Sequence, residues 1–238
     1  MKYSFLGKSL IVERAGKRTF VVGDLHLGYD EGLRSSGVFI VSNLFEETKK
    51  ELTSLLEKAG QVDEIILLGD LKHIFGQILT SEWKEIFAII ELLRMYCSKI
   101  IFIKGNHDVI MEPIAKRYGV LLYDYYLLGN CAFLHGDRDF PEIYDAKITC
   151  WVVGHAHPAI SIQEGVKNEK YKCFLVVLYK RKKVIVLPSF FPGSQGIDIK
   201  LQDLGLIWPL DVKRGRVFVV NDTQEVLDFG ALETILGP

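Results

Sequence analysis

All six histidines of the 238-residue chain lie a few residues beyond short apolar runs, beside aspartates, glycines and one asparagine. The five blocks are Gly23-Asp24-Leu25-His26, Gly69-Asp70-Leu71-Lys72-His73, Gly105-Asn106-His107-Asp108, His135-Gly136-Asp137 and Gly154-His155-Ala156-His157. Imidazole, carboxylate and amide groups suit borderline-to-hard divalent metals such as Mn, Fe, Zn or Ni, and they require no thiolate. The blocks therefore predict a metal centre.

The number of candidate ligands indicates how many ions this centre holds. Seven residues have a suitable side chain: Asp24, His26, Asp70, Asn106, His135, His155 and His157. Seven ligands are too many for one tetrahedral ion, but they suit two ions that share one carboxylate. After Gly154 we expect His155 and His157 to diverge in a turn and reach different ions. Two cations about 3.5–4 Å apart clamp a phosphoryl group and lower the pKa of bound water, so we expect hydrolysis of a phosphate ester.

The apolar runs before these blocks predict buried strands, because they are short and fully apolar. They are Phe20–Val22, Ile65–Leu68, Ile100–Ile103, Cys131–Leu134 and Trp151–Val153. Helical periodicity lies between and after the first three strands, over residues 43–59, 81–95 and 109–118. Asn43 with Glu46 is typical of a capping box, and Thr80 or Ser81 of an N-cap, whereas Gly60 and Gly119 are typical of helix ends.

Strands that alternate with helices predict an α/β fold with an at least partly parallel sheet. Ligands bind in the crevice outside the carboxyl ends of such strands, which is where the five blocks lie. After His157 the pattern changes to strands over residues 171–179, 183–187 and 216–220, with a turn at 180–182. These strands either continue the sheet or form a second sheet packed on the first. Because we find no linker between two cores, we expect a single domain over residues 1–238.

The balance of charges limits where the chain could bind nucleic acid. The net charge is -1, so no overall basic field attracts nucleic acid, and such binding must be local. The candidate patch is Lys180–Lys183 with the lysines shortly before it, although a solvated hairpin tip is the favoured interpretation. In the loop over residues 188–196, Phe190 and Phe191 either stack a base or cap the core.

The cysteines and the chain's hydropathy indicate a location. The four cysteines form no C-x-x-C pair and resemble small core hydrophobes of a reducing compartment. Lys8, Glu13 and Arg14 interrupt the N-terminal apolar residues, so we expect no signal peptide. No run of 18 apolar residues exists to span a membrane. We therefore expect a cytoplasmic protein without a membrane partner.

The five blocks, in this order, resemble the calcineurin-like metallophosphoesterase superfamily, whose signature is D-x-H, G-D, G-N-H-D/E, H and G-H-x-H. The resemblance covers Gly23 through His157, about the first two thirds of the chain. His73 and the Gly154–Pro158 run are most similar to the SbcD-related phosphoesterases, particularly the small family found beside DNA ligases and helicases. The resemblance implies a four-layered metallophosphoesterase-type α/β sandwich, in which helices flank mixed sheets.

The resemblance also assigns each ligand to an ion. It implies one ion held by Asp24, His26 and His157, a second held by Asn106, His135 and His155, and Asp70 as the bridge between them. Manganese is the expected metal, with iron, zinc or nickel as alternatives.

The resemblance leaves His107 free of metal, as a proton donor to the leaving group or a stabiliser of its charge. Two nearby dications would oppose protonation of this imidazole, and a carboxylate would restore its pKa. Asp108, adjacent in sequence, is the candidate for that carboxylate. His73 is either a contact to the substrate phosphate or an ordinary hydrogen-bonded histidine.

The function expected on this basis is that of a two-metal phosphodiesterase, including a nuclease acting on single-stranded or damaged DNA with a helicase or ligase partner. The residues after His157 leave little room for the capping domain of SbcD-type nucleases, which favours small diesters and flexible single strands. One alternative is a hydrolase of a nucleotide or of a pyrophosphate bond. Another is an interaction scaffold with a degraded metal site, which the presence of all seven candidate ligands disfavours.

Overall fold

The first of two sheets carries three of the predicted blocks. The computed structural model describes residues 2–35, 37–38, 43–165, 167–200 and 203–236. The strand order of this sheet is β1 (Lys2–Leu6), β2 (Ser9–Arg14), β3 (Lys17–Val22), β4 (Glu64–Leu68), β5 (Ile100–Ile103) and β6 (Leu121–Tyr123). The first three strands are antiparallel, and β3 to β6 run parallel. The partly parallel sheet is therefore confirmed.

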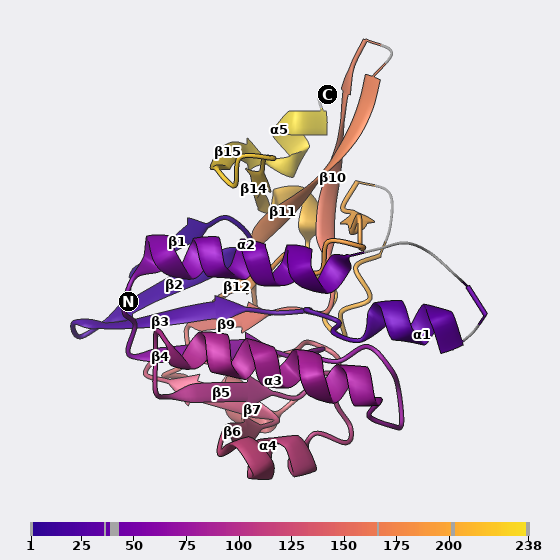
Figure 1. The fold of residues 1–238 in the computed structure, drawn as a ribbon. Helices are drawn as coiled ribbons and strands as arrows, with labels where there is room; N and C mark the ends of the chain where they lie inside the picture. Colours follow the sequence, from indigo (N-terminus) through magenta and orange to yellow (C-terminus); the bar gives the residue numbers. More distant parts are fainter. Residues whose placement is uncertain (1, 36, 39–42, 166, 201–202, 237–238) are drawn as a thin grey trace.

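Helices cover one face of this sheet. α2 (Leu44–Ala59) and α3 (Thr80–Arg94) lie side by side over the strands, and α4 (Glu112–Tyr118) lies next to α3 (Figure 1). A short helix, α1 (Tyr29–Ser35), follows β3. The apolar stripes of α2 and α3, including Leu52, Leu55 and Ile86, bury completely against side chains such as Phe20 and Ile65. This face is the first apolar core.

The second sheet contains the remaining blocks. Its strand order is β13 (Ile197–Asp198), β10 (Pro158–Glu164), β11 (Lys167–Tyr179), β12 (Lys182–Val186), β9 (Cys150–Val153), β8 (Cys131–Leu134) and β7 (Tyr125–Leu128). β14 (Arg216–Val220) pairs with the later half of β11 and with β15 (Val226–Ala231). β12, β9 and β8 run parallel. Of the two completions expected for the late strands, the second sheet is the one that forms.

The two sheets pack face to face, which explains why their central strands are fully apolar. Successive side chains of a strand point to opposite faces. Phe20 and Val22 therefore contact the helices, whereas Val21 joins Val152 and Ile185 in a core between the sheets. All five predicted strands are confirmed. The four cysteines are free and buried, as expected of small core residues.

The outer face of the second sheet is covered by short elements instead of long helices. They are the 3₁₀ helices η1 (Pro141–Tyr144) and η2 (Val212–Arg214), the helix α5 (Leu232–Leu236) and the loop that contains Leu204 and Trp208. Trp151 packs beneath them with no exposed surface. Helix layer, sheet, sheet and outer layer together give the metallophosphoesterase-type sandwich, so the predicted fold class is confirmed.

Several predicted helix ends differ from the structure. Asn43 precedes α2, but its side chain makes no capping hydrogen bond, so the predicted capping box is wrong. The N-cap of α3 is Leu79 instead of Thr80 or Ser81, because the Glu82 carboxylate accepts the backbone N–H of Leu79 at 2.8 Å. Gly60 and Gly119, with φ of 68° and 60°, end α2 and α4 as predicted.

The third helix begins later than the periodicity indicated. It starts at Glu112 instead of residue 109, directly before Pro113. Proline has no N–H to donate and is favoured in the first turn of a helix, where that donor is not needed. The helix start therefore coincides with Pro113.

Two further sequence features find their places in the fold. Lys182 begins β12, which is parallel to β9, so the basic segment lies at the opposite strand ends from the block that follows β9. The Lys182 amine is buried and donates to the Asp145 carbonyl at 2.9 Å. In the loop after β12, Phe190 and Phe191 are buried, so they cap the core. None of the helices in the described part of the chain combines the length and apolar composition needed to cross a bilayer.

Candidate metal centre

Tight turns at the strand ends bring the blocks of both sheets together. Backbone N–H groups of Asp24 and His26 donate to the carbonyls of Gly69 and Asp70, both at 3.0 Å, which joins the loops after β3 and β4. The backbone N–H of His155, after β9 of the second sheet, donates to the Asp24 carboxylate at 3.2 Å. The five blocks therefore meet at one edge of the sandwich.

Three of the predicted ligands form a first group, which we call the Asp24 group. The Asp24 carboxylate Oδ1 lies 3.1 Å from His157 Nε2, and His157 Nε2 lies 3.5 Å from His26 Nε2. One ligand atom from each residue falls within 4.8 Å of the other two. Asp24 and His26 come from the first sheet and His157 from the second, so this group spans both sheets.

The remaining predicted ligands form a second group, which we call the Asp70 group. His135 Nε2 lies 3.4 Å from Asp70 Oδ2, 3.2 Å from His155 Nδ1 and 3.2 Å from Asn106 Oδ1. The other ring nitrogen of His135 donates to the Leu68 carbonyl at 3.1 Å. That hydrogen bond makes Nε2 the nitrogen that faces the group, as in many metal sites.

One oxygen of Asp70 faces both groups. Oδ2 lies 3.8 Å from His26 Nε2 and 3.4 Å from His135 Nε2. The other oxygen, Oδ1, accepts the backbone N–H of His107 at 3.0 Å, which orients the carboxylate. Asp70 therefore occupies the position that the shared ligand requires.

The spacing of the ligand atoms tests whether these residues fit metal ions. Bonds of about 2.0–2.2 Å to one tetrahedral ion place its ligand atoms about 3.4 Å apart. Five of the closest nitrogen and oxygen pairs in the two groups lie between 3.1 and 3.5 Å apart. Two of these pairs join two imidazole nitrogens, whose lone pairs repel unless a cation or a proton lies between them. The donor set therefore fits two divalent ions.

The electrostatics of the site are those of a cation-binding centre. Burial lowers the pKa of His26 to about 3, so this imidazole stays neutral. Burial also opposes the charge on His135, but the hydrogen bond to Asp70 and the Asp24 carboxylate outweigh it and raise the pKa of His135 to about 10. Burial opposes ionisation of Asp24 and Asp70, yet neighbouring histidines hold the pKa of both below its usual range. Without metal, the site therefore binds a proton on His135 that an ion must displace.

Backbone strain is concentrated at the same residues. Nine described residues other than glycine have a positive φ, and five of them are predicted ligands: Asp24, His26, Asp70, His155 and His157. A left-handed conformation costs such residues on the order of 1–3 kcal/mol each and persists where the surrounding structure enforces it. The strained positions therefore coincide with the predicted ligands.

Two block glycines leave room for the ligands. A Cβ atom on Gly105 would lie 2.2 Å from Asp70 Oδ1, and one on Gly69 would lie 2.2 Å from His135 Nδ1. Gly69 also has a φ of +82°, which L-residues rarely adopt. At these positions a side chain would occupy the space of a ligand.

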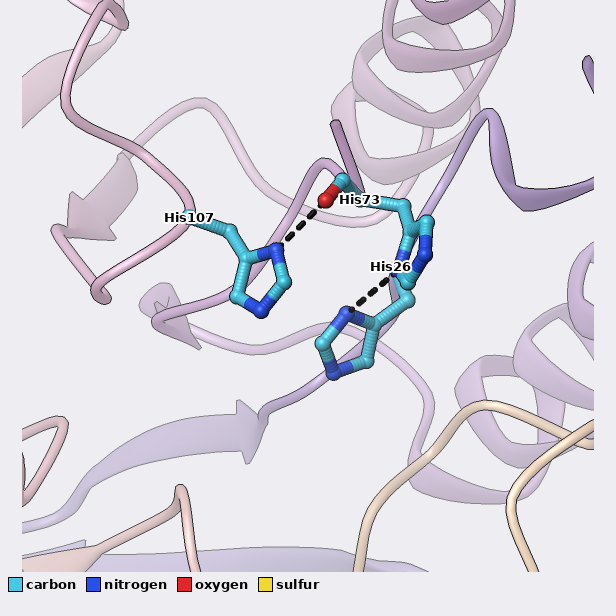
Figure 2. Close-up of side chains that lie close together, drawn as sticks. All are labelled: His26, His73 and His107. Carbon is cyan, nitrogen blue, oxygen red and sulfur yellow. Dashed lines mark hydrogen bonds between the residues drawn. The ribbon is translucent and has the colours of Figure 1, made fainter. Parts of the chain in front are cut away.

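His107 and His73 lie beside His26 of the Asp24 group (Figure 2). His107 donates from Nδ1 to the His73 carbonyl, which leaves Nε2 3.7 Å from Asp70 Oδ2. His73 Nδ1 lies 3.4 Å from His26 Nδ1. Because His26 uses Nε2 toward the Asp24 group, its Nδ1–H donates to His73. Both histidines are half-buried, and burial lowers the pKa of His73.

The structure places the Asp108 carboxylate against the backbone of the loops after β4 and β5. Its carboxylate is buried and accepts N–H groups of Gly105 at 3.0 Å, Leu71 at 3.1 Å and Lys72 at 3.2 Å. Burial and the Asp70 charge raise the pKa of Asp108 to about 6. Its predicted partnership with His107 stays a prediction, while its contacts tie the loops after β4 and β5 together.

Sequence reasoning missed the residues that support Asp24. The backbone carbonyl of Asp24 accepts Ser189 Oγ–H at 3.1 Å and the Phe191 N–H at 3.0 Å. Half-buried Lys172 donates in turn to the carbonyls of Ser189 and Phe191. A lysine in a strand pattern predicts an exposed residue, so no local signal indicates this role.

Comparisons with known proteins match the chain to a family model and its fold to that of solved structures. A family model described as calcineurin-like phosphoesterase matches residues 17–150, more than half of the chain. The nuclease MPE from Pseudomonas putida has a similar fold, with a TM-score of 0.59 and 17% identity over 96% of this chain and 100% of that chain. A single mutant of Vps29 from Entamoeba histolytica is 14% identical, with a TM-score of 0.40 over 89% of this chain and 99% of that chain. No curated protein matches the chain by sequence.

Proposed function

The chain belongs to the calcineurin-like phosphoesterase family, and from that premise we propose that it is a phosphodiesterase that cleaves nucleic-acid strands. Enzymes of this family depend on a centre of two metal ions. The chain is therefore a metal-dependent hydrolase of ester bonds. Manganese is the proposed metal, and the phosphodiester of unpaired DNA is the proposed substrate. The proposed role is cytoplasmic DNA repair beside a helicase or ligase.

The observation that carries the proposal is the position of Asp70 Oδ2 between the two groups, 3.8 Å from His26 Nε2 and 3.4 Å from His135 Nε2. Asp24, His26 and His157 would hold one ion, and Asn106, His135 and His155 the other, with Asp70 shared. Two such ions supply Lewis acidity at a phosphoryl group and make water a stronger nucleophile near neutral pH. The chain itself holds the ligands apart and fixes their tautomers.

His107 would donate the proton to the leaving group. Its Nδ1 is fixed by the His73 carbonyl, so Nε2 is the atom that faces the centre. A protonated Nε2 can donate to the oxygen that leaves, and an alkoxide leaving group of a diester needs that proton more than an activated phenolate does. His73, whose ring is stacked beside that of His107, would contact the substrate phosphate.

The nuclease part of the proposal has two supports. The fold is similar to that of a nuclease from Pseudomonas putida. The five blocks resemble the small phosphoesterases found beside DNA ligases and helicases, which is also the basis for the proposed partner. A hydrolase of nucleotides or pyrophosphate bonds and an interaction scaffold remain the rival functions.

The first test is hydrolysis of bis(p-nitrophenyl) phosphate against p-nitrophenyl phosphate in Mn²⁺. We expect preference for the diester, lost in Asp70→Asn and retained in Asp222→Asn, an exposed carboxylate between β14 and β15. Preference for the monoester would contradict the phosphodiesterase. Activity on neither compound would favour a pyrophosphate substrate or the scaffold.

A further inference from the structure

An exposed aromatic ring lies beside the proton carrier of the proposed reaction. Phe75, in the loop between β4 and α3, is 58% exposed. Its ring centroid lies 3.7 Å from that of His107, with the two planes tilted by 34°. His107 thus covers part of the phenyl ring, and solvent covers the rest. An isolated exposed phenylalanine needs no explanation, but this one borders the metal centre.

Two buried charged residues hold the loop that presents Phe75. Glu82 is fully buried and accepts the N–H of Ile74 at 2.9 Å. Lys72, also fully buried, donates from Nζ to the carbonyl of Gln77 at 3.0 Å. Burying such groups is unfavourable unless they are paired, so their partners are strongly constrained. The loop is therefore fixed on both sides of Phe75, and the ring is held outward instead of folding into the core.

Among the residues that the structure describes, the other aromatic side chains near the centre have no comparable free surface. Tyr29 packs on His73, with 4.7 Å between ring centroids, and on Phe191, with 4.8 Å. Phe191 is 5% exposed and also contacts the His26 ring. These rings form a closed wall on the His26 side of the centre. Of the described rings beside the centre, Phe75 is the one with a surface open to a ligand.

We propose that Phe75 is a stacking platform for the nucleobase next to the phosphodiester under attack, and this rests on the proposed function. In a nucleotide, one sugar ring separates the base from its phosphate. In the structure, the His107 ring separates Phe75 from Asp70 of the metal centre. Stacking on an aromatic side chain accepts any base, because every base has a π-face. A base in an intact duplex is already stacked on its neighbours and would have to be extruded first. Phe75 thus selects unpaired nucleotides with little preference for sequence.

The test separates stacking on Phe75 from support of His107 by Phe75. We would measure fluorescence anisotropy of a short oligothymidylate and of an abasic strand of the same length, with Ca²⁺ in place of Mn²⁺ to slow cleavage. The proteins are the wild type, Phe75→Ala, Phe75→Tyr and the control Phe87→Ala. Phe87 is also an exposed phenylalanine, but it lies on α3 against Tyr118.

We expect the wild type to bind the oligothymidylate about 10- to 100-fold more tightly than the abasic strand. Phe75→Ala should lose this preference, while Phe75→Tyr and Phe87→Ala should keep it. Equal weakening of both strands by Phe75→Ala would show that the ring only supports His107. That result, an unchanged preference in Phe75→Ala or a wild type without preference would overturn the stacking role. If bis(p-nitrophenyl) phosphate is hydrolysed in such a case, the stacking role alone fails and the phosphodiesterase stands.

Discussion

Replacing Gly105 by alanine tests the position of the shared carboxylate without changing any ligand. The new Cβ would lie 2.2 Å from Asp70 Oδ1 and 2.5 Å from the Asp70 backbone nitrogen. Non-bonded atoms pack at about 3.5 Å, so the carboxylate would have to move by about 1 Å. The φ of Gly105 is not in the left-handed region, so the backbone itself accepts alanine.

A shift of this size is large for a metal ligand. Distances in a metal site are held within about 0.2 Å, and a 1 Å misplacement of a catalytic group can lower the rate about 100-fold. Asp70 Oδ2 faces His26 of the Asp24 group and His135 of the Asp70 group, so both ions should bind more weakly. We therefore expect Gly105→Ala to lose at least about 100-fold in diester hydrolysis and to need more Mn²⁺ for half-maximal activity.

The control is Gly215→Ala, whose Cβ would lie 2.5 Å from Leu175 and 2.6 Å from Val177, in the apolar core of the second sheet. It should lower thermal stability while leaving the Mn²⁺ requirement unchanged. The assay is the rate of bis(p-nitrophenyl) phosphate hydrolysis across a Mn²⁺ titration, with circular dichroism to confirm folding. A folded Gly105→Ala protein with the wild-type rate and Mn²⁺ requirement would refute this placement of Asp70.

Two further predictions concern protons. His107→Ala should keep both metal ions, measured by elemental analysis, yet lose about 10²- to 10⁴-fold in rate, most with poor leaving groups; equal losses for alkyl and nitrophenyl esters would argue against proton donation. The pKa of His135 is raised to about 10 without metal, above the ordinary value of 6.5, so its stabilising effect is complete below pH 6.5 and lost as the pH rises toward 10. Calorimetry of the chelator-treated protein should show this loss; a melting temperature independent of pH in that range would contradict it.

The central strands and the clustering of the candidate ligands were predictable because local and global constraints agree there. A fully apolar run such as Ile65–Leu68 is buried on both faces, and the structure places helices on one face and the second sheet on the other. The polar residues that follow each run, such as Asp70 and His135, have no role in a core. Their position at parallel strand ends already implied that they meet.

The features that were not predictable depend on contacts between distant segments. The start of α3 is set by Glu82, which also binds the Ile74 backbone, a loop contact that periodicity does not report. Lys172 is only half-exposed because its amine donates to carbonyls of the loop after β12. The exposure of Phe75 depends on how the loop between β4 and α3 packs on His107. Its place two residues after His73 is visible in the sequence.

The most direct test of a two-ion centre that shares Asp70 is metal stoichiometry combined with electron paramagnetic resonance of the Mn²⁺-loaded protein. We expect two Mn²⁺ per wild-type chain with a spectrum of exchange-coupled ions, because Asp70 Oδ2 faces both groups. Asp70→Asn should bind fewer ions and show no coupling. A single bound ion in the wild type, or two coupled ions in Asp70→Asn, would contradict the shared carboxylate.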